Sequence, residues 1–167
     1  MSQRDIVAQG LKIKQKSVFN LDQLYKTMFR WFELYGFDMQ EREYRDSVEG
    51  NAKHLEIKWK AVKRIDDYIQ FVIITNFLVL GFETIEIEED GVKMKTNKGE
   101  VEMNFYAYLE KDYEDKLKDS GYAKVIREIY DKYIIKNRIE SLEGELYEEL
   151  YKLLDEIKAF LNLHRFQ

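Results

Sequence analysis

Few side chains in this sequence could carry out chemistry, and histidine and cysteine are the scarcest of them. The 167-residue chain has two histidines, His54 and His164, and no cysteine. A zinc site needs three or four converging ligands, and catalysis by a thiolate needs cysteine. The sequence therefore predicts no metal site, no cofactor and no thiol chemistry.

Acidic residues could act as general acid and base if two of them shared a partly buried cleft. Glu110, Asp112 and Asp115 cluster where the last strand is expected to end. The ordinary alternative is the preference of acidic side chains for the first turn of a helix. We predict no catalytic residue. Whether the protein is an enzyme stays open, and the sequence favours a non-catalytic protein.

The basic residues do not form a platform for nucleic acid. The net charge is −5, so there is no overall attraction to phosphate. Lys58 and Lys60 flank Trp59, but the alternation of a strand places Trp59 on the opposite face from both lysines. An aromatic and basic binding groove needs them on one face. We therefore predict no nucleic-acid partner.

Alternating apolar and charged residues over 53–110 predict the sheet that must position these groups. Asp90-Gly91 is a strong signal for a two-residue hairpin. A second turn at Lys98-Gly99 would continue the same alternation. We expect an antiparallel meander with one wet face and the charged row Glu86–Lys95–Glu102. The expected cross-strand pairs include Glu88–Lys93, Ile85–Thr96, Thr96–Val101 and Met94–Met103.

The chain upstream of this meander predicts two further strands. Residues 55–65 alternate as in a half-buried strand, and Asp66-Asp67 is expected to turn the chain back. The following strand, Tyr68–Phe82, is apolar on both faces. Such a strand needs cover on both faces, which must come from helices or from a second copy of the protein.

One helix is expected before the long strands. Asn20 and Gln23 form a capping box, and Gly36 is a natural terminator for the helix that follows. Strands over 11–19 and 37–45 are expected on either side of this helix. A polar loop is expected over 47–53.

Apolar residues recur at three- and four-residue steps from about Tyr122 onwards, which predicts a helical C-terminal region. An unbroken helix over 122–163 would be roughly 60 Å long. A compact domain of this size has a diameter of only about 40 Å. We therefore expect a break around Lys136–Arg138 and a second helix lying across the sheet.

These elements predict a single α+β domain over 1–167, sheet-rich over 11–112 and helical over 113–165. The longest apolar run, Ile69–Phe82, is interrupted by polar residues and is shorter than the roughly 20 residues of a spanning helix. The N-terminal residues lack the apolar core of a signal peptide. We expect a cytoplasmic protein without a transmembrane segment.

Gln70 and Asn76 lie on one face of the most apolar predicted strand, where buried amides need hydrogen-bond partners. The ordinary interpretation is a satisfied structural amide. The alternative is a ligand pocket, which combines apolar walls with a few placed polar groups. The candidate pocket residues are Trp59, Val72, Ile74, Asn76, Met94, Met103 and Phe105.

Twelve tyrosines, several of them in the C-terminal helical region, suggest contact surfaces, because tyrosine is enriched at protein interfaces. Ordinary amphipathic packing would also explain them. The candidate interface residues are Phe71, Ile73, Phe77, Tyr147 and Tyr151.

A strand, a helix, a long antiparallel meander and a closing C-terminal helix follow one another in this chain. This order resembles START-like, helix-grip domains. The resemblance implies a sheet that holds an apolar small molecule or lipid against the last helix. The segment Glu156–His164, together with Glu110–Tyr113, also resembles archaeal proteins of unknown function, and that resemblance implies no activity.

The sequence thus leads us to expect a non-catalytic binding or interaction domain that is homo-oligomeric or binds a protein partner. The alternative is a helix-grip pocket for an apolar small molecule or lipid.

Overall fold

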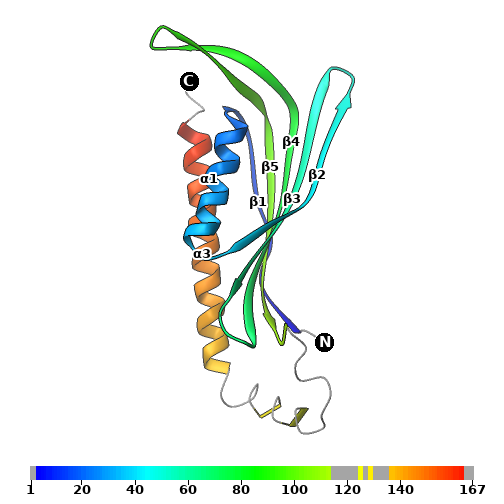
Figure 1. Cartoon of the computed structure of the whole chain (residues 1–167), viewed down its shortest axis with the longest axis vertical. Helices are drawn as coiled ribbons and strands as arrows, with labels where there is room; N and C mark the ends of the chain where they lie inside the picture. Colours follow the sequence, from blue (N-terminus) through cyan, green and yellow to red (C-terminus); the bar gives the residue numbers. More distant parts are fainter. Residues whose placement is uncertain (1–2, 114–123, 126–127, 130–135, 164–167) are drawn as a thin grey trace.

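The chain folds as α+β, with one antiparallel sheet and two long helices in its described part. The computed structural model describes residues 3–113, 124–125, 128–129 and 136–163. The five strands lie in the order β1-β5-β4-β3-β2 (Figure 1). The elements are β1 (Gln3–Phe19), α1 (Leu21–Leu34), β2 (Asp38–Glu49), β3 (Ala52–Arg64), β4 (Ile69–Glu89), β5 (Val92–Lys111) and α3 (Lys136–Leu163).

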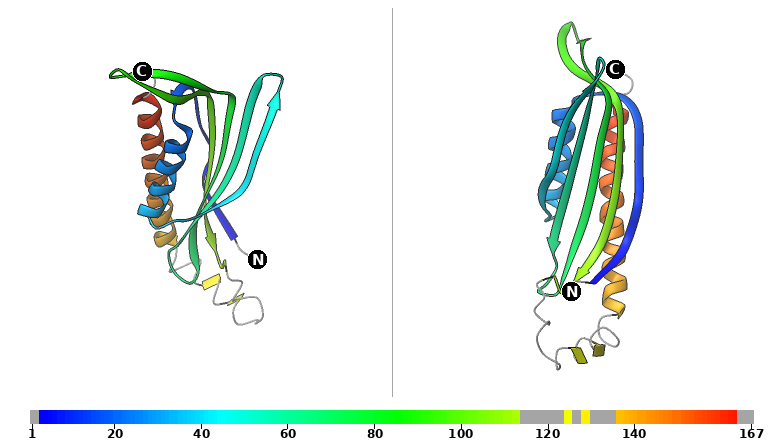
Figure 2. Two further views of the ribbon diagram at one scale, coloured as in Figure 1. Left: turned by 45° about the horizontal axis from the view of Figure 1, so that its top comes forward. Right: turned by 90° about the vertical axis from the view of Figure 1, so that its right-hand side faces the viewer.

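Both helices lie on the same face of the sheet. In the right-hand view of Figure 2 the strands face the viewer, and α1 and α3 lie behind them. No described helix crosses the face that is turned to the viewer. We call this second face the open face of the sheet and the first the helix face.

The longest ladder joins β4 to β5 and follows the predicted Asp90-Gly91 turn. Both turn residues have positive φ, 50° and 77°, as a tight hairpin of this kind requires. Glu88 pairs with Lys93, and Ile85 pairs with Thr96. The register predicted for this hairpin is confirmed.

The predicted second turn at Lys98-Gly99 is wrong. β5 runs through it without reversing, so Val101 pairs with Val79 instead of Thr96, and Met103 pairs with Phe77 instead of Met94. A Cβ atom on Gly99 would lie 3.1 Å from the carbonyl oxygen of Leu80. The glycine therefore permits a close approach of two strands where the ladder shifts register. The row Glu86–Lys95 forms, but Glu102 is not part of it.

The described helices cover the side chains on one face of β4 and not those on the other. The odd-numbered residues lie on the helix face in a fully buried row: Ile69, Phe71, Ile73, Phe77 and Val79. The even-numbered apolar residues Val72, Ile74, Leu78 and Leu80 lie on the open face, where all except Val72 are half-buried. Helices thus supply the predicted cover for one of the two apolar faces.

The two helices cover the sheet as the sequence predicts. The Asn20 side chain accepts a hydrogen bond from the Gln23 backbone at 3.0 Å, and Gly36 has φ +80° just after the end of α1. Leucine and isoleucine residues of α3 are fully buried against the sheet: Leu146, Leu150, Leu153, Ile157 and Leu161. α3 is described from Lys136 onwards, and the expected break around Lys136–Arg138 and most of the expected helical stretch before it adjoin or fall on residues outside the described ones.

Ion pairs and turn contacts link α3 to the sheet. Lys63 Nζ of β3 lies 2.7 Å from Glu149 Oε1 of α3. Arg138 lies 2.7 Å from Asp66. The Asp66 side chain also accepts the backbone N–H of Tyr68 and of Ile69, which confirms the turn expected at Asp66-Asp67.

Two boundaries differ from expectation for local reasons. The stretch 47–53 is not a polar loop, because it consists of the paired ends of β2 and β3 joined by a tight turn at Gly50-Asn51, with Gly50 at φ +64°. β1 begins at Gln3 rather than at residue 11, because two bulges let the strand continue along β5. The second bulge contains Gly10 at φ +69°, and a glycine inside a strand is a signal for a bulge, whereas the first has no such residue.

The assignment of faces predicts a sharp contrast between adjacent residues of β4. We expect Phe77→Ala, on the helix face, to lower the free energy of unfolding by about 3–5 kcal/mol because it leaves a cavity in the core. We expect Leu78→Ala, on the open face, to lower it by about 1 kcal/mol, because little packing is lost there. Urea unfolding of both variants measures this contrast, and equal losses would contradict the assignment.

Candidate interaction surface on the open face of the sheet

The candidate pocket residues are divided between two faces of the sheet. Trp59, Met103 and Phe105 are buried on the helix face, because Trp59 and Phe105 both pair with Thr75 of the odd-numbered row and Met103 pairs with Phe77. Val72, Ile74 and Asn76 lie on the open face. Met94 is 46% exposed on the projecting β4–β5 hairpin. These seven side chains therefore do not converge on one cavity.

The candidate interface residues also separate. Phe71, Ile73 and Phe77 lie in the core beneath the helices, where they have at most 1% exposure. Tyr147 and Tyr151 lie on the outer side of α3, with ring centroids 4.6 Å apart and a hydroxyl–hydroxyl hydrogen bond of 3.1 Å. The apolar core of β4 is thus a packing surface within one chain.

The acidic cluster does not form a cleft of convergent carboxylates among the described residues. Glu110 accepts a hydrogen bond from Gln70 at 2.7 Å, which satisfies that amide. Asp112 is buried next to it with φ +52°, and its backbone N–H donates to the Tyr68 carbonyl. Asp115 lies outside the described residues. Within the described chain, no three histidine and acidic side chains are placed to hold a metal ion.

The open face presents two adjacent rows of apolar side chains. One row crosses four strands, from Ile6 through Tyr108 and Val72 to Val62. The next row pairs Tyr106 with Ile74. We call these six residues the apolar patch. The sequence signal for the patch is the apolar run from Phe105 to Leu109. Because β5 is continuous, this run places apolar side chains on both faces of the sheet.

Exposure within the apolar patch increases towards one edge. Val72 at its centre is fully buried and Tyr108 is 9% exposed, whereas Tyr106 is 36% and Ile6 is 65% exposed. The guanidinium of Arg4 lies 4.7 Å from the centroid of the Tyr108 ring. The patch therefore has a preformed floor and accessible side chains around it.

Charged residues flank the apolar patch in two different ways. On the β1 side, Lys12 lies 2.7 Å from Glu102 and Lys14 lies 3.2 Å from Glu100. On the β3 side, Lys58 and Lys60 have no acidic group within 4.0 Å in the part of the chain that the structure describes. Neither lysine is held in a close ion pair with a described residue, although Glu43 is the cross-strand partner of Lys58 and lines the same hollow with Glu56 and Glu102.

A polar hollow of about 300 Å³ borders the patch. Asn76 and Asn104 are paired across its floor, with Lys58 beside them in the same row. A hollow of this size accommodates one or two side chains better than a drug-sized molecule. A larger hollow, of about 700 Å³, lies between α1 and α3 over Trp31 and Tyr35, away from the open face.

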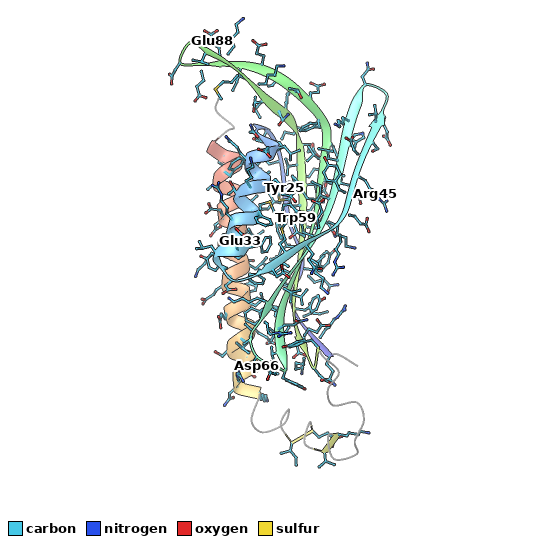
Figure 3. The ribbon with its side chains drawn as sticks, in the orientation of Figure 1. Tyr25, Glu33, Arg45, Trp59, Asp66 and Glu88 are labelled. Carbon is cyan, nitrogen blue, oxygen red and sulfur yellow. The ribbon has the colours of Figure 1, made fainter. Side chains whose placement is uncertain are left out.

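A hydrogen-bonded cluster ties α1 to the edge of the sheet on the helix face. Glu41 Oε2 accepts from the Tyr25 hydroxyl at 3.0 Å and from Trp59 Nε1 at 3.4 Å. In Figure 3 Tyr25 and Trp59 lie between α1 and the sheet, whereas Arg45 lies on the β2–β3 hairpin. Burial, and then the hydrogen bond to Glu41, raises the pKa of Tyr25 to about 12. Tyr25 therefore keeps its proton to a higher pH than an ordinary tyrosine and acts as a structural donor to Glu41.

The sequence matches no protein-family model, and no curated protein matches it. Among the described helices, none combines the length and apolar character needed to cross a membrane. The apolar patch on the open face is therefore the feature of the structure that bears most directly on function.

The raised pKa of Tyr25 predicts a loss of stability at high pH. An unfolded tyrosine releases its proton near pH 10, whereas folded Tyr25 keeps it to about pH 12. The folded state thus binds more protons between these values, and its stability falls as the pH rises through them. We expect melting temperatures of the native protein to fall more steeply from pH 10 to 12 than those of Tyr25→Phe. Parallel curves would contradict this role of Tyr25.

Proposed function

We propose that this chain is a non-catalytic interaction domain that binds another protein through the open face of its sheet. The observation that carries this proposal is the apolar patch of two adjacent rows on a face that no described helix covers. Ile6 and Tyr106 are the exposed members of this patch, and exposed apolar side chains that gather on one surface often mark an interaction site. Tyr106 and Tyr108 suit such a surface, because tyrosine buries a large area and keeps a polar tip.

The flanking charges support a partner with acidic side chains around an apolar centre. Lys58 and Lys60 border the patch without a close ion pair in the described chain. Carboxylates on a partner would pair with them and steer its approach, and this steering would weaken with added salt. The polar hollow at Asn76 and Asn104 would accept a side chain from the same partner.

The helix-grip pocket for an apolar molecule or lipid is the second proposal, and its support comes from the order of elements and from the packing of α3 on the sheet. Such a ligand would need space between α3 and the sheet. Fully buried side chains from both sides occupy that layer, among them Leu150, Leu153 and Phe77. The filled layer favours the interaction surface.

Photo-crosslinking in the native cell tests the proposed partner. We expect benzoylphenylalanine placed at Tyr106, in the apolar patch, to give one discrete covalent adduct with another protein. The matched control is the same residue at Tyr147, which is 44% exposed on the outer side of α3 and has no role in the proposal. Adducts at position 147 alone, or the same pattern at both positions, would contradict the proposal.

The identified partner then allows the contact to be measured. We expect Ile74→Asp to raise the Kd by at least about tenfold, because it puts a charge within the apolar patch that the partner would bury. Tyr147→Asp should leave the Kd unchanged. Isothermal titration calorimetry measures both values, and circular dichroism checks that each variant is folded.

A further inference from the structure

β2 is an exposed edge strand whose outer backbone edge is unpaired in the described chain. It pairs with β3 on one side and ends the sheet on the other. Every residue of β2 except Met39 is exposed, and Tyr44 and Val48 are 54% and 68% exposed. Such an edge is a template for pairing with another strand.

The opposite edge of the sheet is guarded more heavily than β2, which has a single register shift, between Glu41 and Glu43. β1 has two register shifts, and the side chains of Lys12, Lys14 and Lys16 line its open face. Bulges and lysines are features that discourage pairing between edges. α3 also packs close to β1. β2 is therefore the edge that is more suited to a partner strand.

Symmetry restricts how β2 could pair with the same strand of a second copy. In an antiparallel pair of identical strands, the two-fold axis is perpendicular to the sheet and one residue faces its own counterpart. A charged residue at this centre would face a like charge, which destabilises the pair. In the run Arg42-Glu43-Tyr44-Arg45-Asp46, only Tyr44 is uncharged.

Centring the pair on Tyr44 also matches every charge around it. Arg42 of one copy faces Asp46 of the other, and Glu43 faces Arg45. Both relations occur twice by symmetry, which gives four pairs of opposite charges. Moving the centre by one residue in either direction places Glu43 opposite Glu43 or Arg45 opposite Arg45.

We infer that β2 joins a second copy of this chain by antiparallel pairing over Arg42–Asp46, with Tyr44 on the two-fold axis. The pairing ends near Arg42, because the bulge between Glu41 and Glu43 changes which face each residue occupies. Glu43 and Arg45 already lie 3.4 Å apart within one chain, so the dimer completes a ring of four alternating charges. The inference does not depend on the proposed function, because it uses the edge and not the open face of the sheet.

The absence of cysteine permits a test that is specific for this register. Directly opposed residues of antiparallel strands have Cα atoms about 4.5–5.5 Å apart, which is within the range of a disulfide. We expect Tyr44→Cys to form a disulfide-linked homodimer under mild oxidation. In the same dimer the two copies of Val48→Cys would be roughly 27 Å apart and should stay monomeric on a non-reducing gel. No crosslink at position 44, or equal crosslinking at both positions, would overturn the inference.

Charge exchange without cysteine supplies an independent test. By analytical ultracentrifugation we expect the native chain to dimerise with rising concentration. We expect Asp46→Arg to raise the Kd of the dimer at least about tenfold, because the new arginine faces Arg42 of the other copy in two symmetric pairs. The double variant Arg42→Asp/Asp46→Arg restores opposite charges across the axis and should recover dimerisation. Asp46 also pairs with Lys53 in its own chain, at 2.9 Å, and the double variant does not restore that contact. A monomeric native chain, or no recovery in the double variant, would overturn the inference.

Discussion

The structure depends on one constraint, which is that β4 is apolar on both faces and lies inside the sheet. Its odd-numbered residues form the floor of the core under α1 and α3, and its even-numbered residues form the middle of the open face. Burial of each large apolar side chain contributes about 1.5–3 kcal/mol, so the helix face determines where α3 packs. The even-numbered face has no equivalent cover in the described chain, and the interaction surface follows from this imbalance.

The long ladder between β4 and β5 makes that surface rigid. It keeps one register from Ile69 to Leu80, shifts near Gly81, and continues to the hairpin tip. Side chains from four strands are therefore held in rows across the open face before any partner arrives. A preformed surface loses less conformational entropy on binding than a mobile one. Pairing at β2 would extend the same sheet into the second copy and leave the apolar patch free.

Much of this fold could be predicted from the sequence because residues with strong preferences for helix caps and turns mark where its elements begin and end. Asn20, Gly36, Asp66 and Asp90-Gly91 each mark a cap or turn, and all are found as expected. The turn expected at Lys98-Gly99 failed because a reversal and a continuous strand there give the same alternation of apolar and charged residues. The pocket and interface sets failed to converge for a related reason. Alternation shows that Phe71 and Val72 lie on opposite faces, but it does not show which face the helices cover.

Accessibility of single cysteines on adjacent residues of β4 tests the central claim that one apolar face is covered and the other is open. Ile73 is fully buried on the helix face and Ile74 is half-buried on the open face. We predict that a thiol reagent modifies Ile74→Cys in the folded protein at about the rate at which it modifies an unfolded control. Ile73→Cys should react only as fast as the protein unfolds. Equal protection at both positions, or faster reaction at position 73, would contradict the account.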